Sequence, residues 1–398
     1  MPSSTASAPV DVERVDRFER VPPGDWPADP RSTVFLTAEW TRSVEGALAR
    51  EQAYVLGRDG DGGSVGTMGV YVVGPDTGRY FNPAALLTFH LGNPELVEHL
   101  RPDERGEAAE LAATLRPEDL APAAVATAPF AFVHSLSSTG GRAVAERLVA
   151  ELEEIGREAG AASLAVLYVE EDEHELRDVL RRAGFAEALV AANAVLPIEW
   201  DSFDGYLGSL SRSRRAKVKR EVKRFRESGI EVAHGSILEN LDRLAHLQAL
   251  LQEKHGAGYD LERERGAFLS VTTHIHPYAR LLVARRDGDL VGFILYFEKE
   301  GLVHPKMGAR DLSRVTEADA LHFYLGYYAI VEQAIAGGAR EIQYGLDAYG
   351  TKVFRGCVLR DLYWYVKAAS PSLAVAADIV SRGRRRYLDA YRALSPRR

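Results

Sequence analysis

The stretch GRAVAERLVAELEEIGREAGAASLAVLYVEED, residues 141–172, predicts a helix followed by a strand. Its apolar residues recur at the spacing of one helical face, at Val144, Leu148, Leu152 and Ile155. Gly160 is placed to end the helix, and residues 163–169 are an apolar run of strand length. The stretch LHFYLGYYAIVEQAIAGGAREIQYGL, residues 321–346, has the same order of helix, glycine and strand. The sequence therefore predicts two similar α/β units.

An expected hairpin comes before each of these helix–strand pairs. Residues 53–74 and residues 278–300 both read as two strands joined by an Asp-Gly-Asp turn. The first copy carries about 50 extra residues between hairpin and helix, so we expect an insertion at about 75–126. The domain ranges that follow are a disordered tail over 1–30, an N-terminal domain over 31–200, a C-terminal domain over 201–370 and a final helix over 371–398.

The composition excludes several classes of protein. With 46% apolar and 27% charged residues, the 398-residue chain is in the globular range. It has neither an apolar run long enough to span a bilayer nor the features of a signal peptide, so we expect a cytoplasmic protein. Its single cysteine, Cys357, excludes a disulfide framework and a multi-cysteine metal site, and we predict no metal.

One segment departs from the acidic balance of the chain, whose formal net charge is −8. Residues 212–226 hold nine arginines and lysines against one acid, Glu221, and apolar residues at helical spacing predict that this helix docks with its basic side chains outward. The candidate phosphate-binding residues are Arg212, Arg215, Lys219 and Arg226. The partners that fit are tRNA, a nucleotide-linked substrate or coenzyme A, in that order. The other interpretation is a solvated helix whose arginines pair with acids elsewhere in the chain.

Gly140 and Gly141 stand at the mouth of the helix in the opening stretch, after a strand expected at 130–134. Backbone N–H groups and the helix dipole at such a place attract anions. The arrangement resembles the acetyl-CoA-dependent N-acetyltransferases of the GNAT superfamily, in which this loop holds the pyrophosphate. That family has Gln or Arg where this sequence has Ser138. The loop is therefore either a possible coenzyme A site or a tight turn into the helix.

Residues 316–357, together with the segment 206–232, resemble the Fem-like acyltransferases of the same superfamily, the FemAB or peptidoglycan-biosynthesis type. The features that carry the likeness are a Leu-His-Phe helix with paired tyrosines, then a strand, then a loop with Lys and Arg-Gly, here Leu321, His322, Phe323, Tyr327, Tyr328, Lys352, Arg355 and Gly356. The family's His before the Lys is missing. The resemblance implies an α/β (α+β) fold of two tandem GNAT-like domains, with mixed central sheets flanked by helices. It also implies transfer of an amino acid from aminoacyl-tRNA to a precursor's amine.

Amide formation needs an unprotonated amine, a group that takes its proton, and a donor for the oxyanion. The candidate for base or amine-orienting carboxylate is Asp347, although it could be a simple turn residue. Lys352 and Arg355 are the candidates for phosphate or oxyanion contacts, or else a surface pair, and Tyr349 could protonate the leaving oxygen. The other candidate substrate-binding residues are Lys306 and Tyr328.

Three functions follow from these patterns. The preferred one is an acyltransferase that moves an aminoacyl group from aminoacyl-tRNA onto an amine of a small-molecule or peptidoglycan precursor, without a cofactor. The second is an N-acyltransferase that uses acetyl-CoA or another acyl-CoA as donor. The third is a catalytically inactive GNAT pair that acts as an RNA-binding or scaffold protein.

Overall fold

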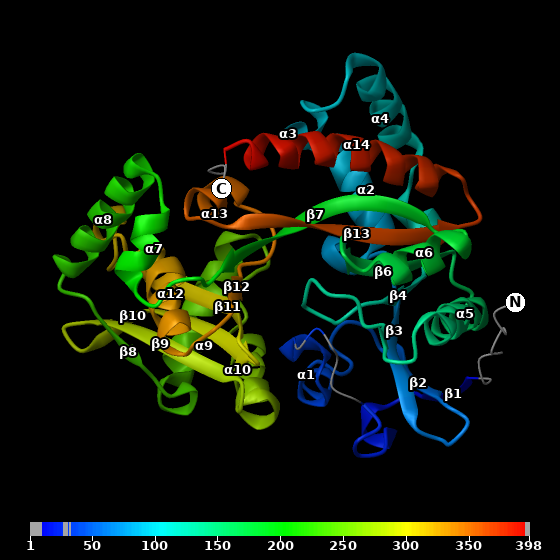
Figure 1. Ribbon diagram of the computed structural model, residues 1–398, viewed down its shortest axis with the longest axis horizontal. Helices are drawn as coiled ribbons and strands as arrows, with labels where there is room; N and C mark the ends of the chain where they lie inside the picture. Colours follow the sequence, from blue (N-terminus) through cyan, green and yellow to red (C-terminus); the bar gives the residue numbers. More distant parts are fainter. Residues whose placement is uncertain (1–9, 27–30, 32, 395–398) are drawn as a thin grey trace, which may run out of the picture. The chain divides into compact units, whose positions relative to one another are not determined.

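The protein folds into two compact units in a computed structural model that describes residues 10–26, 31 and 33–394. Of these residues, unit 1 holds 10–26, 31, 35–193 and 359–393, and unit 2 holds 33–34, 194–358 and 394. Figure 1 labels the helices and strands of both units. Within the described ranges, no helix is both long and apolar enough to span a membrane.

Unit 1 is built on a mixed sheet. The order of the strands is β1 (Asp11–Val15), β2 (Glu51–Arg58), β3 (Ser64–Val73), β4 (Ala123–Ala126), β6 (Ser163–Glu170), β13 (Val358–Ala368) and β7 (Ala186–Pro197), and the short β5 (Ser137–Ser138) pairs with β3. The parallel pair is β4 with β6, while β1, β2 and β3 run antiparallel to their neighbours. The expected strand at 130–134 is a turn, and the strand of that region is β4, eight residues earlier in the chain.

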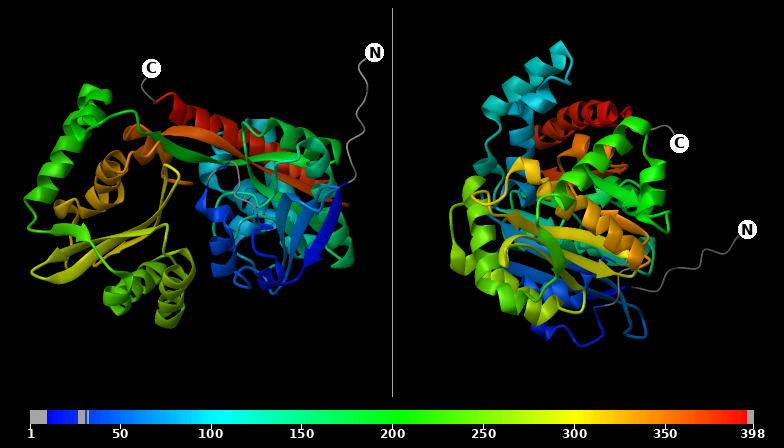
Figure 2. Two further views of the ribbon diagram at one scale, coloured as in Figure 1. Left: turned by 60° about the horizontal axis from the view of Figure 1, so that its bottom comes forward. Right: turned by 90° about the vertical axis from the view of Figure 1, so that its left-hand side faces the viewer.

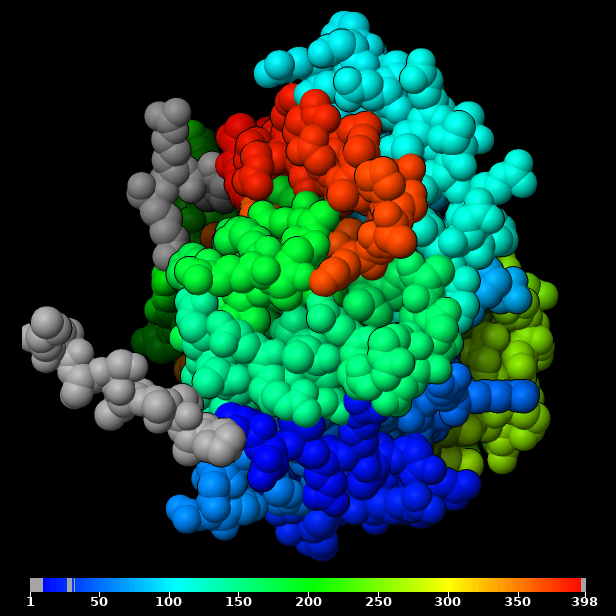
Figure 3. All heavy atoms as spheres, turned by 90° about the vertical axis from the view of Figure 1, so that its right-hand side faces the viewer, coloured from blue at the N-terminus to red at the C-terminus, as the bar shows by residue number. Residues whose placement is uncertain are grey.

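Helices cover the unit 1 sheet. They are α1 (Ala38–Ser43), α5 (Arg142–Glu158), α6 (His174–Arg182) and α14 (Ser372–Arg392), with short 3-10 turns η1 (Phe18–Arg20) and η2 (Val34–Leu36), the latter at the boundary of the units. The predicted face of α5 is buried and packs on β2, β3 and β4. Figure 3 shows the face of unit 1 that includes the segment from α5 to α6. The opening stretch therefore forms the predicted helix and strand.

The predicted insertion forms a helical layer of its own. It contains η3 (Arg79–Phe81), α2 (Pro83–Gly92), α3 (Pro94–Val97), α4 (Pro102–Thr114) and η4 (Pro117–Leu120). This layer packs against α14, as Figures 1 and 3 show. The buried carboxylate of Glu104 on α4 bonds to Arg382 and Arg386 of α14. The insertion and the last helix therefore stabilise each other.

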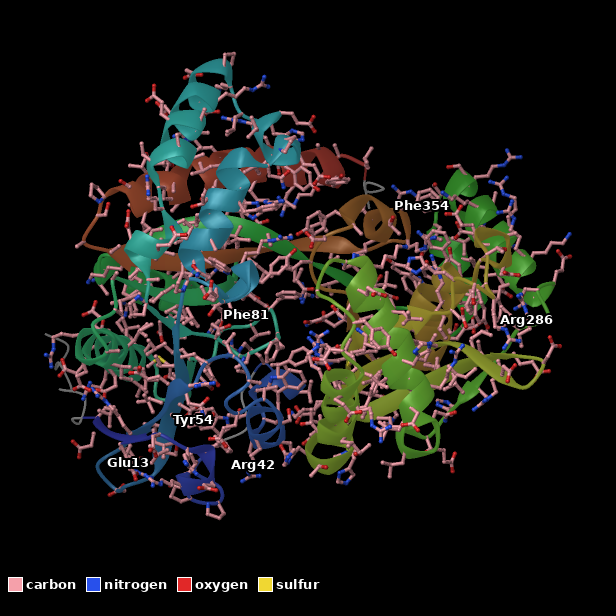
Figure 4. All side chains as sticks on the ribbon, turned by 180° about the vertical axis from the view of Figure 1, so that it is seen from behind. Glu13, Arg42, Tyr54, Phe81, Arg286 and Phe354 are labelled. Atoms are coloured by element: carbon pink, nitrogen blue, oxygen red, sulfur yellow. The ribbon has the colours of Figure 1, made fainter. Side chains whose placement is uncertain are left out.

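The predicted tail over 1–30 differs from the structure in its described part. Residues 11–15 form β1, which pairs with β2, because an unpaired edge of β2 is available to them. Phe18 is fully buried, with its ring centroid 5.1 Å from those of both Trp26 and Tyr54. Figure 4 labels Tyr54 in this region of unit 1. The remaining parts of the predicted tail, 1–9 and 27–30, lie outside the described residues.

The strands of unit 2 continue the same strand order from the end of β7. The last three residues of β7 pair with β12 (Glu341–Gln343), and the order continues with β11 (Leu302–Arg310), β10 (Asp289–Lys299), β9 (Ala279–Arg286) and β8 (Glu231–His234). The helices are α7 (Phe203–Ser209), α8 (Arg212–Arg226), α9 (Ile237–Lys254), α10 (Leu261–Ser270), α11 (Leu321–Phe323), α12 (Ala329–Ala336) and α13 (Tyr349–Phe354), with the 3-10 turn η6 (Glu317–Asp319) and the π-helical turns η5 (Val271–Ile275) and η7 (Tyr324–Tyr328). Figure 2 shows the strands of this sheet with α9 and α10 beside them.

The two units divide the chain differently from the predicted domains. Residues 359–393, expected in a C-terminal domain and a separate last helix, belong to unit 1. The reason is that β13 pairs with β6, an antiparallel partner almost 200 positions earlier in the chain. The repeat predicts the order of the elements in each unit. It does not reveal that the last strand, β13, and the last helix, α14, belong to unit 1.

Candidate functional site

The loop before α13 carries the predicted Asp347. Asp347 and Ala348 both have a left-handed backbone, with φ of 61° and 47°, and both are exposed. Lys352 on α13 is 6% exposed, and its ammonium group donates to the carbonyl oxygens of Tyr344, Gly345 and Leu346. Burial lowers the pKa of Lys352 to about 8. Lys352 therefore holds the chain just before Asp347 in this strained form.

Arg355, which follows α13, belongs to a buried network. Its guanidinium donates to a Glu221 oxygen at 2.7 Å and to the Tyr328 hydroxyl at 3.1 Å. The Tyr328 hydroxyl in turn donates to the same carboxylate. The guanidinium carbon also lies 4.3 Å from the centroid of the Phe323 ring. The structure thus brings together two predicted site residues, Arg355 and Tyr328. Their shared partner is Glu221, the single acid of the basic segment 212–226.

This network explains how the basic helix docks. Glu221 on α8 is 6% exposed, and Val218, Val222 and Phe225 are buried beside it, as the apolar spacing predicts. The Phe225 ring stacks on Tyr324 at 3.6 Å between centroids. In the sequence, Glu221 stands out as the only acid among nine bases, but the fact that it is buried becomes visible only when Arg355 lies beside it.

The opposite face of α8 is cationic. Five of its side chains are exposed and make no hydrogen bond or ion pair within the described chain: Arg212, Lys219, Arg220, Arg224 and Arg226. The predicted Arg215 instead donates to the carbonyl oxygen of Leu210 at 3.0 Å, at the end of α7. Lys217 and Arg214 lie over the ring of Phe354, which Figure 4 labels. Lys223 pairs with Glu227, and Glu332 lies close enough to attract Arg226, so pairing with acids offsets only part of the charge of this face among the described residues.

A cavity of about 970 Å³ lies in unit 2, between α9, β10, β11 and the segment 321–326. The predicted Lys306 lines it because of a bulge in β11. Leu295 pairs with Met307 and Tyr296 pairs with Pro305, so Lys306 has no opposite residue in the ladder. Proline lacks the N–H that a regular ladder needs, and bulges re-aim side chains. Burial lowers the pKa of Lys306 to about 8.

The sequence does not reveal the other side of this cavity. Arg243, His246, Leu250 and Lys254 of α9 all line it, at spacings of three and four that place them on one helical face. That face is a signal in the sequence, but its partner, β11, lies some 50 residues further along. The segment 321–326 includes part of η7, and π-helical turns are frequent at functional sites.

The remaining predicted residues lie elsewhere. Tyr349 is buried at the start of α13, with 1% of its surface exposed. Gly140 and Gly141 precede α5 in unit 1, and Gly141 has a φ of 71°. No side chain caps this helix. In the described ranges, no group of three or more His, Cys, Asp and Glu side chains is arranged to hold a metal ion.

Known proteins resemble this chain in sequence and in fold. The FemAB-like family model, described as peptidoglycan biosynthesis/recognition, matches residues 122–393. A putative 8-amino-7-oxononanoate synthase 2 of Mycobacterium tuberculosis is 27% identical over 218 residues, which are 52% of this chain and 27% of that protein. The chain thus spans about a quarter of the length of this curated relative.

Two solved structures align with most of the chain. The crystal structure of FemX covers 89% of this chain and 96% of its own, with a TM-score of 0.55 and 13% identity. A tandem GNAT protein from the clavulanic acid biosynthesis pathway covers 91% of this chain and 99% of its own, with a TM-score of 0.48 and 12% identity. The predicted α/β fold with a mixed sheet flanked by helices is confirmed by the likeness to FemX. Since the family model matches more than half of its residues, the chain belongs to the FemAB-like family.

Proposed function

We propose that the protein is an acyltransferase that moves an aminoacyl group from aminoacyl-tRNA onto an amine of a small-molecule or peptidoglycan precursor. Membership of the FemAB-like family supports acyl transfer and the link to peptidoglycan. The observation that carries the choice of donor is the cationic face of α8. Five side chains there are exposed and make no hydrogen bond or ion pair in the described chain, and a row of such charges binds a phosphate backbone.

The chemistry requires little from the protein. The amine nitrogen attacks the ester carbonyl carbon, the bond to the ribose oxygen breaks, the amine gives up a proton and the ribose oxygen takes one. Asp347, exposed on its strained loop, is the proposed base or amine-orienting group. Lys352 keeps the loop in place through its three carbonyl contacts, so its effect on the substrate is through Asp347. The predicted role of Tyr349 as donor to the leaving oxygen requires a movement that exposes its side chain, because Tyr349 is 1% exposed.

Arg355 and Tyr328 support the same site from within. Their network with Glu221 joins α8 to the end of α13, so the proposed donor surface and the loop of Asp347 depend on one another. Lys306 is a proposed substrate-binding residue of the cavity, and burial lowers its pKa to about 8. We propose the cytoplasm, the place of charged tRNA, as the location.

Neutralising the cationic face tests the donor. The triple variant Lys219→Gln, Arg220→Gln, Arg224→Gln should lower the affinity for aminoacyl-tRNA and flatten its salt dependence by roughly two units of log–log slope. The matched control replaces three exposed arginines of unit 1, Arg20, Arg157 and Arg182. Equal tRNA affinity and salt dependence in the triple variant and the wild type would show that α8 does not bind the donor.

A second function is favoured by the uncapped start of α5. This helix has 17 residues, and its first N–H groups receive no side-chain cap, as an anion site requires. Acyl-CoA would then be the donor, with its pyrophosphate at Gly140 and Gly141. Arg142→Glu tests this, because it places a carboxylate in the first turn of α5, where it repels a bound anion without changing the glycines of the loop. Stabilisation by acetyl-CoA that this variant abolishes would favour the second function.

A further inference from the structure

The unit 2 cavity contains a cation that has no hydrogen-bonded acid among the described residues, although Glu317 lies close enough to attract it. The guanidinium of Arg310, at the end of β11, lines the cavity and makes no hydrogen bond or ion pair with the described residues. It is partly buried, and burial lowers its pKa. A cation removed from water without a partner is unfavourable, so a site of this kind is completed by an anion.

The other residues that line the cavity include more basic than acidic side chains. Asp311 is the one carboxylate among the lining residues, and it accepts hydrogen bonds from Arg243 and from Ser313. The cations that line the cavity are Arg243, Lys254, Lys306 and Arg310. His322, whose pKa burial and Arg310 lower, lies at the same end of the segment 321–326. Any ligand of this cavity therefore meets an excess of positive charge.

The floor of the cavity is apolar. It is formed by buried residues of the sheet and of the segment 321–326: Phe293, Ile294, Ala309, Leu321 and Leu325. Leu312 and Leu250 also line the cavity, with 53% and 38% of their surface exposed. Exposed leucines next to a buried apolar floor extend the surface that an apolar ligand would cover. A small inorganic anion would leave this surface in water.

We propose that the cavity binds an amphiphilic anion, with a carboxylate or a phosphate ester at Arg310 and an aliphatic body along Phe293, Ile294 and Leu312. The proposal deepens the proposed function and rests on it for the idea that this ligand is a substrate of acyl transfer. Binding itself needs no transfer. Binding of the amphiphilic anion and the proposed acyl transfer can therefore be refuted independently of each other.

Calorimetric titration of the full chain with decanoate, decyl phosphate and decanol tests the proposal. We expect saturable binding of at least one of the two anions, and weaker binding of decanol. The head group that binds identifies the source, a fatty carboxylate or a phosphate ester. Acetate and inorganic phosphate should bind at least about 100-fold more weakly, since each buried methylene contributes roughly 0.8 kcal/mol.

Variants locate the anion. Arg310→Gln should weaken binding of the anion about 10- to 100-fold, the range for a hydrogen bond to a charged group, and Arg310→Lys should restore part of it. The matched control is Arg340→Gln, an exposed arginine of unit 2 outside the cavity. Equal affinity for the anions in Arg310→Gln and wild type, equal affinity for decanol, or no saturable binding of either anion would overturn the proposal. If the wild-type protein binds the amphiphilic anion but shows no aminoacyl transfer, the proposed function is refuted and the binding proposal stands.

Discussion

Replacing Glu221 by leucine leaves the Arg355 guanidinium buried without its carboxylate. Arg355 is 3% exposed, so water cannot substitute for the lost partner. Breaking a buried ion pair from one side costs about 3 to 5 kcal/mol, because an uncompensated charge stays in the interior. We therefore expect Glu221→Leu to destabilise the contact between α8 and α13 by that amount, and Glu221→Gln, which keeps one acceptor oxygen, by about 1.5 to 3 kcal/mol.

Hydrogen exchange followed by mass spectrometry measures this effect in unit 2 by itself. Peptides that cover 206–226 and 349–357 should exchange about 150- to 5,000-fold faster in Glu221→Leu, whereas peptides from α5 in unit 1 should not change. The double variant Glu221→Leu, Arg355→Met should recover about 2 to 3 kcal/mol relative to the sum of the single variants. A loss below about 1 kcal/mol in Glu221→Leu, or strictly additive effects, would refute the account of how α8 docks.

Three further outcomes follow from the structure. Lys352→Gln should release the chain before Asp347 and lower kcat, with little change in the stability of the other elements of unit 2. Steady-state kinetics and hydrogen exchange of residues 344–348 check this. The hydrogen bond from Arg386 lowers the pKa of Glu104 to about 2, so the stability that Glu104 contributes is present above its unfolded pKa of about 4.3 and is lost as pH falls towards 2; Glu104→Gln should flatten this acid limb in thermal melts. An amine-reactive reagent should modify Lys306 with a midpoint near pH 8, about two units below exposed lysines, and a midpoint near 10 would contradict its burial.

The elements that could be predicted from the sequence are those specified by local patterns. The helical face of Val144, Leu148 and Leu152 and the Asp-Gly turns lie within single segments, so spacing alone indicates the structure. The insertion over about 75–126 stays a prediction from the difference in length between the two copies, and the structure describes helices in this range. The docked face of α8 was predictable because its apolar residues recur at helical spacing.

The features that were missed depend on contacts between distant segments. The pairing of β13 with β6, and of β1 with β2, follows from which edges are open in the fold. The burial of Lys352 and Arg355 follows from carbonyl, carboxylate and ring partners on four different elements, so a Lys and an Arg at spacing three look like a surface pair in the sequence. The bulge at Lys306 had a local signal in Pro305, but the cavity behind it needs α9.

The most direct test of the central claim is transfer of a radiolabelled amino acid from aminoacyl-tRNA to a peptidoglycan-precursor amine or another small-molecule amine. Wild-type protein should form an amide product at a rate that falls steeply with salt, and Lys219→Gln, Arg220→Gln, Arg224→Gln should slow it while the unit 1 control variant does not. Amide product from acyl-CoA alone, or tRNA-dependent product at an unchanged rate in the triple variant, would contradict the account.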